Sequence, residues 1–156
     1  ETAIEAEIRE ELKKPTGELT KADFEKVMKL NLSSTKITDA SLSEVAKLQQ
    51  LKTLYLDNTQ ITDAGLMEVA KLNQLSDLYL GSTKITDKAL KHLTKLNGLS
   101  SIGLIWTQIT DTGLMELAKM KQLQCLYLDY TKVTRGGVAQ LQMALPKCNI
   151  LHKATQ

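Results

Sequence analysis

Residues 51–74 read LKTLYLDNTQITDAGLMEVAKLNQ, and this stretch is one copy of a unit that repeats along most of the chain. Neighbouring copies begin at Val27, Leu75, Leu99 and Leu123, at a constant spacing of 24 residues. A fixed period of this length is typical of repeat proteins, in which each unit must stack on its neighbours to bury a core. The pentamer that marks each unit stands at Thr35–Asp39, Thr59–Asp63, Thr83–Asp87, Thr107–Asp111 and, altered, Thr131–Arg135.

Each unit contains two different hydrophobic periods, one after the other. Leu54 and Leu56 alternate with Tyr55, which places both leucines on one side of a short strand. Thr62 or Asp63 is then expected to cap a helix, and an Asp in the first turn suits the positive end of the helix dipole. The residues that follow recur at helical spacing and form one apolar stripe: Leu66, Val69, Ala70 and Leu72.

Stacking these units predicts an α/β solenoid. Strands lie about 4.8 Å apart whereas helices need about 10 Å, so the stack bends with a short parallel sheet on its concave face and helices on its convex face. The five units and one terminal strand give six expected strands. Such a sheet makes a concave face about 25 Å long.

The pattern LxxLxLxxTxITDxGLxxLAKL resembles the leucine-rich repeats, and most closely the subtype whose helical half reads ITDxGLxxLA. The resemblance covers nearly the whole chain and implies a right-handed solenoid. That subtype often has cysteine where this chain has Thr35, Thr59, Thr83, Thr107 and Thr131. We expect a buried ladder of hydroxyls that satisfies backbone groups at the turn. A metal or catalytic column is the alternative, but a hydroxyl is a poor ligand and no base stands beside it.

The N-terminal residues 1–26 depart from the repeat and predict a helical cap, because the open end of a solenoid needs a cover. A first amphipathic helix is expected over 3–14, stopped by Pro15. A second helix is expected from Thr20 to Met28, opening on a capping-box-like start. This segment resembles the N-terminal cap of internalin-type bacterial surface proteins.

The other end also departs from the repeat. The five repeats span residues 27–146, and the last helix is expected to extend until Pro146. Residues 147–156 are expected to form a C-terminal cap, with an edge strand at 149–152 and a polar tail. Cap, repeats and tail together make a single domain, residues 1–156.

The outward positions of the strands form columns on the concave face. Five of the six aromatic residues of the chain fall on these columns, and Phe24 alone is left for the cap. A leucine core has no need of exposed rings, whereas interfaces are enriched in Tyr and Trp. The sequence therefore predicts a partner-binding surface made by Tyr55, Asp57, Asp77, Tyr79, Ile105, Trp106, Tyr127, Asp129 and Tyr130.

A shallow pocket is expected within this surface, floored by Gly103 and walled by Tyr79, Trp106 and Tyr127. The alternative is that the tyrosines merely stack on one another across adjacent strands, since aromatic residues are good strand formers. Stacking does not account for Ile105 and Trp106 beside Gly103, and we therefore favour a contact site.

The charge of this face limits the kind of partner. Asp57, Asp77 and Asp129 oppose Lys29, and the net charge of the chain is only +2, so nucleic acid is disfavoured. An aromatic, weakly acidic face suits a protein or peptide bearing Lys or Arg, or a sugar stacked on a ring. The longest stretch without charge has 15 residues and is partly polar, so no membrane insertion is expected.

Signatures of catalysis and of cofactor binding are absent from the sequence, including GxGxxG, a phosphate loop, HExxH and CxxC. One nucleophile arrangement is conceivable: Cys125 on the concave face, with His152 one strand along and Asp129 nearby, as in a small-molecule hydrolase. No oxyanion hole accompanies it, and a histidine in a terminal tail is a poor base. A disulfide between Cys125 and Cys148 is a further alternative. We predict no enzyme, cofactor or metal site.

The favoured function is therefore a non-enzymatic, monomeric recognition module for a protein or peptide, with carbohydrate as another ligand class. The competing hypothesis is a spacer or scaffold segment of a larger surface protein, supported by the start at Glu1 and the regularity of the repeats. The resemblance to bacterial surface proteins favours an extracytoplasmic or cell-surface location.

Overall fold

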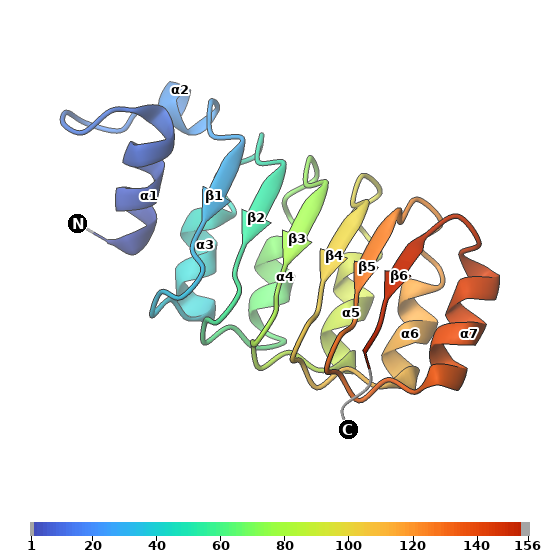
Figure 1. Ribbon diagram of the computed structural model, residues 1–156. Helices are drawn as coiled ribbons and strands as arrows, with labels where there is room; N and C mark the ends of the chain where they lie inside the picture. Colours follow the sequence, from blue (N-terminus) through green and yellow to red (C-terminus); the bar gives the residue numbers. More distant parts are fainter. Residues whose placement is uncertain (1, 154–156) are drawn as a thin grey trace.

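The computed structural model describes residues 2–153 and shows one curved stack of coils (Figure 1). Glu1 and residues 154–156 of the predicted tail lie outside the described residues. Six parallel strands form one sheet in chain order, as predicted. They are β1 (Lys29–Asn31), β2 (Thr53–Tyr55), β3 (Asp77–Tyr79), β4 (Ser101–Gly103), β5 (Cys125–Tyr127) and β6 (Asn149–Leu151).

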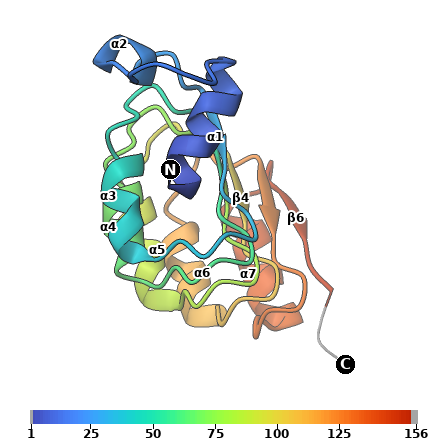
Figure 2. The same ribbon diagram turned by 90° about the vertical axis from the view of Figure 1, so that its left-hand side faces the viewer.

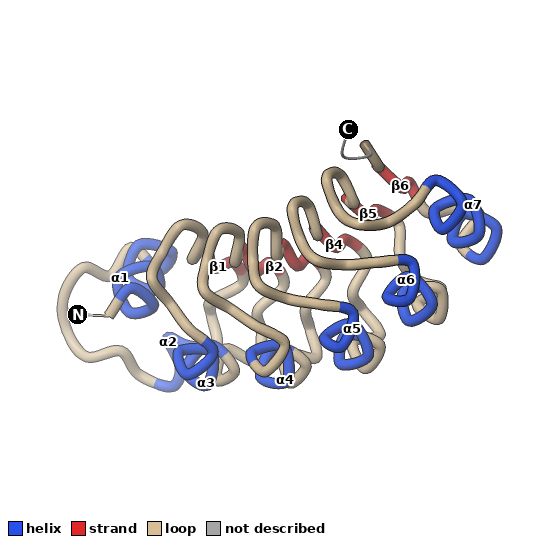
Figure 3. Tube along the Cα trace, turned by 90° about the horizontal axis from the view of Figure 1, so that it is seen from below, coloured by secondary structure: helices blue, strands red, loops and turns tan. Residues whose placement is uncertain are grey.

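Helices line the other side of the stack, so the predicted α/β solenoid is confirmed. Seen from below, the strands follow the inner side of the arc and the helices of the repeats follow its outer side (Figure 3). None of the helices in the described part of the chain has both the length and the apolarity needed to cross a bilayer. The helices are α1 (Ala3–Leu12), α2 (Lys21–Phe24), α3 (Leu42–Val45) after a 3-10 turn at Asp39–Ser41, α4 (Gly65–Val69), α5 (Asp87–Leu93), α6 (Asp111–Leu117) and α7 (Arg135–Ala144).

The leucines form the core between the sheet and the helices. Leu54 pairs in register with Leu78 of the next strand, and both are fully buried. Leu56 and Leu66 are also fully buried, which confirms that the strand and helix stripes of one unit face the same interior. Each buried leucine contributes about 1.5–3 kcal/mol relative to an exposed one, so the repeats are held together by this shared core.

The predicted threonine ladder is also confirmed. In every repeat the threonine hydroxyl donates to the backbone carbonyl of the leucine three residues earlier, at 2.6–2.8 Å. Thr107 is 2% exposed, whereas Thr35 in the first repeat is half-buried. The hydroxyls thus satisfy carbonyls that turn inward where the strand ends.

Of the two predicted caps in the ITD segment, it is the threonine that caps the helix, while Asp87 and Asp111 stand in the first turn as expected. Asp63 caps no helix in its own repeat; it accepts hydrogen bonds from the backbone N–H of Thr86 at 2.6 Å and from its hydroxyl at 2.6 Å. We call this contact the Asp–Thr clip. The threonine meanwhile caps its own helix in α5, α6 and α7. The clips join Asp39 to Thr62, Asp63 to Thr86, Asp87 to Thr110 and Asp111 to Thr134.

The N-terminal cap covers the end of the stack, with a shorter second helix than predicted. Helix α1 lies across that end, between the repeat helices and the sheet (Figure 2). Its residues Ile4 and Ile8 are buried in the core. Helix α2 keeps the predicted capping box at Thr20 but ends at Phe24, not Met28, because the chain must extend to enter β1.

The C-terminal edge strand is confirmed as β6, which pairs with β5. Helix α7 ends at Ala144, two residues before the predicted stop. The reason is local: Leu145 precedes Pro146 and leaves the helical region, with φ −126° and ψ 68°. A proline ring disfavours the helical conformation of the residue before it.

Candidate interaction surface on the concave face

The strand register aligns the outward side chains into rows that cross the sheet. Tyr55 stands opposite Tyr79, Tyr79 opposite Gly103, and Gly103 opposite Tyr127. Leu151 of β6 completes this row beside Tyr127 and is 40% exposed. We call Tyr55, Tyr79 and Tyr127 the tyrosine row.

The rings of the tyrosine row contact one another along the sheet. Tyr55 and Tyr79 stack with centroids 4.8 Å apart and planes 9° apart, and the Lys29 ammonium lies 5.4 Å from the Tyr55 ring. Tyr79 and Tyr127 are separated by 6.3 Å and tilted by 46°. The alternative of cross-strand stacking therefore describes Tyr55 and Tyr79 well.

The predicted pocket over Gly103 is wrong. A Cβ atom at Gly103 would lie only 2.7 Å from Cδ1 of Tyr79, so the Tyr79 ring occupies the space left by the missing side chain. Trp106 is no wall of such a pocket either, because its ring stacks on Tyr130. Glycine at this position serves close packing of a neighbouring ring and does not create a hollow.

A second set of outward residues lies where each strand ends, and all of them have a left-handed backbone. Their φ values range from 53° to 60°. Each N–H bonds the next coil; Ser82, for example, donates to the carbonyl of Ile105 at 2.8 Å. The parallel ladder thus continues past the strands. We call this set the exit column: Ser34, Asn58, Ser82, Trp106 and Tyr130.

The exit column contains the most exposed ring of the chain. Trp106 is 57% exposed and stacks on Tyr130, with centroids 4.3 Å apart and planes 15° apart. The left-handed conformation costs a bulky residue about 1–2 kcal/mol. The stack returns about 0.5–1.5 kcal/mol, so packing alone gives little reason for aromatic residues here. Retained strain of this kind is characteristic of functional positions.

Sequence reasoning included Trp106 and Tyr130 in the site but missed the role of Ser34, Asn58 and Ser82. The available signal was their residue type, because Asn and Ser are common where a chain turns through left-handed backbone. The two aromatic members hide that signal, since such rings are normally associated with strands.

The predicted acidic residues are tied to neighbouring coils. Asp57 accepts from the backbone N–H of Gly81 at 2.8 Å, and Asp129 accepts from the N–H of Lys153 at 2.5 Å. Asp77 accepts from the hydroxyl of Thr53 in the preceding coil at 3.4 Å and from that of the adjacent Ser76 at 2.7 Å. These bonds hold the carboxylates in place on the concave face, where their negative charge outweighs the charge of Lys29.

Two side chains on or under the concave face have a pKa above the ordinary value. A hydrogen bond with Cys125, followed by the charge of that thiolate, raises the pKa of the Tyr127 hydroxyl to about 12. Burial, followed by the charge of Cys125, raises the pKa of the Cys148 thiol. Both cysteines are free, so the alternative of a disulfide between them is not realised. Tyr127 and Cys148 therefore stay protonated at neutral pH.

The possible nucleophile arrangement does not assemble. Nε2 of His152 lies 3.1 Å from the carbonyl oxygen of Val133, at the turn before α7. Asp129 is bonded to the backbone of Lys153 and does not orient the imidazole. Within residues 2–153 there is no group of three or more His, Cys, Asp or Glu side chains that could hold a metal ion.

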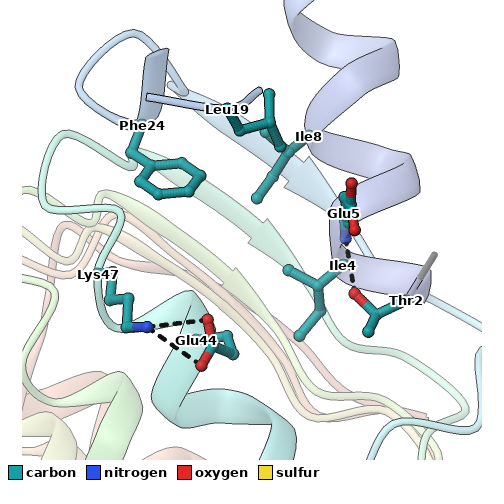
Figure 4. A pocket seen from close by; sticks show the side chains of 8 residues that line it. All are labelled: Thr2, Ile4, Glu5, Ile8, Leu19, Phe24, Glu44 and Lys47. Carbon is teal, nitrogen blue, oxygen red and sulfur yellow. Dashed lines mark hydrogen bonds and ion pairs between the residues drawn. The ribbon is translucent and has the colours of Figure 1, made fainter. Parts of the chain in front are cut away.

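A separate hollow lies beneath the N-terminal cap. Its volume is about 300 Å³, and Ile4, Ile8, Leu19 and Phe24 point toward it from the cap (Figure 4). The ion pair between Lys47 and Glu44 of α3 borders it, with the two groups 3.0 Å apart. Sequence reasoning missed this hollow, because it arises from how α1 and α2 sit on the first repeat.

The fold agrees with comparisons to known proteins. Residues 29–68 match the family described as Leucine Rich repeats (2 copies). A leucine-rich-repeat protein of Leptospira interrogans has a similar structure, with a TM-score of 0.63 and 26% identity over 85% of this chain. The chain has the leucine-rich-repeat fold. Proteins with this fold typically present a concave surface for protein interaction, and most are not enzymes.

Two internalins of Listeria monocytogenes also have this fold. The alignments cover 99% of the chain, with TM-scores of 0.56 and 0.50 and identities of 17% and 20%. The chain spans 33% of the length of the Leptospira protein, and 64% and 85% of the two internalins. No curated protein sequence matches it significantly.

Proposed function

We propose that this leucine-rich-repeat protein is a non-enzymatic recognition module that binds a protein or peptide across its concave face. The observation that carries the proposal is the tyrosine row, a line of half-exposed rings on an acidic sheet. The proposed contact residues are Tyr55, Asp57, Asp77, Tyr79, Ile105, Trp106, Tyr127, Asp129 and Tyr130.

The tyrosine row suits the centre of an interface. A tyrosine brings large contact area with only two rotatable side-chain bonds, so little entropy is lost on binding. Tyr55 and Tyr127 mark the two ends of the row, and Leu151 extends it with 40% of its surface exposed. The mutual contacts of the rings hold them ready for a partner, which lowers the cost of ordering on binding.

The charges favour a basic partner. The three aspartates of the face are fixed by hydrogen bonds to neighbouring coils, whereas the chain as a whole has a net charge of +2. A partner with Lys or Arg would be steered to this face, and its association rate should fall as salt is added. The bonds of His152 to Val133 and of Asp129 to Lys153, in place of contacts with Cys125, support the non-enzymatic part of the proposal.

The experiment is an interaction screen with the intact chain as bait, followed by two matched double variants. Tyr55→Ala with Tyr127→Ala removes the ends of the row and leaves Tyr79 over Gly103. Met67→Ala with Met115→Ala changes helices α4 and α6, where these side chains are 56% and 69% exposed. Circular dichroism confirms that both variants fold.

A specific partner should be retained by the unchanged chain and by the methionine variant, and lost from the tyrosine variant. Retention by the tyrosine variant, or loss from the methionine variant, would place the contact elsewhere. Absence of any retained partner would instead favour the spacer hypothesis, in which recognition belongs to another part of a longer protein.

A further inference from the structure

We propose that the uncovered face of the Trp106 indole, with Ser82 and Asn58 beside it, forms a binding site for a neutral saccharide ring. This site shares Trp106 with the contact surface proposed above, but it lies outside the tyrosine row and does not require a protein partner. Three observations carry it: the direction of the indole face, the chemistry of its neighbours and the strain at Trp106.

The first observation is geometric. Trp106 and Tyr130 occupy the same position in consecutive coils, and their planes are 15° apart with centroids 4.3 Å apart. Adjacent coils of the sheet are themselves about 4.8 Å apart, so the two rings stack along the axis of the solenoid. Tyr130 therefore covers one face of the indole. The other face looks toward the preceding coil, where the equivalent residue is the small Ser82.

The second observation is the pair of polar residues beside that face, Ser82 and Asn58, which we call the polar shelf. Ser82 and Asn58 are exposed, and their backbones are fixed by hydrogen bonds to the following coils at 2.8 Å. The Asn58 amide donates to the hydroxyl of Ser34 at 3.2 Å, which leaves its carbonyl oxygen available. In the described chain the Ser82 hydroxyl makes no hydrogen bond. The free face of the Trp106 indole thus lies beside a hydroxyl and a carbonyl oxygen that can bond a ligand.

This combination matches a saccharide better than a charged side chain. The C–H groups of a pyranose ring carry partial positive charge and pack on the negative face of an aromatic ring, while its hydroxyls both donate and accept hydrogen bonds. A cation on the same face would need carboxylates close by. The two residues beside the free indole face, Asn58 and Ser82, are themselves uncharged.

The third observation is the change from small polar residues to aromatic ones along the exit column. Ser34, Asn58 and Ser82 occupy the left-handed positions of the first three coils, whereas Trp106 is kept at the same strained position with 57% of its surface exposed. The left-handed backbone at Trp106 costs conformational free energy, and its exposed ring has no role in the core that would explain this cost. Binding of a ligand to the free face of the ring accounts for its presence at this position.

The chain has a single tryptophan, so its fluorescence reports directly on this site. The test titrates the intact protein with neutral cello-, malto- and chito-oligosaccharides at millimolar concentrations. At least one series should shift the Trp106 emission to shorter wavelength and reduce its quenching by acrylamide. No response to any of the three series would overturn the proposal. A response only to Lys- or Arg-containing peptides would also overturn it and assign the face to a peptide.

Two variants make the assignment specific. Ser82→Ala should weaken the affinity for the responding sugar about fivefold, the usual effect of losing one hydrogen bond. Ser100→Ala, the same change just before strand β4 and so at the opposite edge of the sheet from Ser82, should leave the affinity unchanged. Equal effects of both variants would overturn the proposed shelf. The variant with Tyr55→Ala and Tyr127→Ala should still bind the sugar, which separates a failure of this site from a failure of the tyrosine row.

Discussion

Both carboxylate oxygens of Asp87 accept hydrogen bonds from Thr110 of the next coil. One bond comes from the backbone N–H at 2.8 Å and the other from the hydroxyl at 2.5 Å. The same contact recurs between every pair of consecutive repeats from Asp39 to Thr134. Charge-assisted hydrogen bonds are stronger than neutral ones, so these clips add directional contacts to a core that is otherwise held by leucines.

Removing one clip should destabilise the stack measurably. Asp87→Ala deletes two hydrogen bonds to a charged group, and we expect the free energy of unfolding to fall by about 1.5–3 kcal/mol. Urea unfolding followed by circular dichroism measures this. Lys88→Ala, at the exposed neighbouring position, is the control and should change the free energy by less than about 0.5 kcal/mol. Equal effects of the two substitutions would contradict the importance of the clip.

The threonine ladder allows a matched comparison between a buried and a half-buried copy of one hydrogen bond. Thr107→Val removes a hydroxyl that donates to the carbonyl of Leu104 at 2.7 Å, in a place where water does not replace it. We expect a loss of about 1 kcal/mol. Thr35→Val removes the same bond to Leu32, also 2.7 Å long, near solvent. The loss there should be less than half as large, and the reverse order would refute this explanation.

The strain at Trp106 predicts an unusual tolerance to substitution. Trp106→Asn should leave the free energy of unfolding within about 1 kcal/mol of the original, because relief of backbone strain offsets the lost stack. Asn58 already adopts this conformation in an earlier coil, with φ 54°. Leu104→Ala, two residues away in the core, should cost about 2–5 kcal/mol. A comparable loss for Trp106→Asn would mean that the indole is a packing residue.

The N-terminal cap should lose stability in acid through Asp23. Its carboxylate accepts from the Lys14 ammonium at 2.7 Å, and this bond, followed by hydrogen bonds from Thr20, holds the pKa of Asp23 far below its ordinary value. A depressed pKa stabilises the folded state above the unfolded value near ~4, and the contribution disappears as pH falls through the folded pKa. A carbon-13 titration of Asp23 should show this low pKa.

The control for that titration is Lys14→Met, which removes the first cause of the shift. In this variant the pKa of Asp23 should rise toward its ordinary value, while the hydrogen bonds from Thr20 keep part of the depression. An unchanged pKa in the variant would assign the effect to the capping box alone.

Much of the architecture could be predicted from the sequence, because the period of 24 residues fixes which residues become neighbours. Leu54 and Leu56 identify the buried side of a strand, and the same spacing places Tyr55 beside Tyr79. The Asp–Thr clip could not be predicted in this way. Within one unit, Thr62 and Asp63 look like a local helix cap, and only the stacked structure shows that the aspartate reaches the following coil.

The details of the candidate surface also depend on packing that a pattern does not contain. Alignment of columns places Tyr79, Gly103 and Tyr127 in one row, but it does not indicate that the Tyr79 ring leans over the glycine. It likewise lists Trp106 among outward residues without showing that Tyr130 covers one of its faces. Ring orientation depends on backbone φ and on neighbouring side chains, and neither follows from spacing.

The clips connect residues 23 positions apart in every case, and this regularity makes each coil an exchangeable length of chain. Excising residues 75–98 would bring Asp63 against Thr110 and Asn58 beside Trp106, so the Asp–Thr clip at the junction would be preserved. The distance between the N-terminal cap and the indole would then shorten by one step of about 4.8 Å. The number of coils therefore sets the distance between the two ends of the molecule. Whole coils can be added or removed to change this distance without redesigning either end.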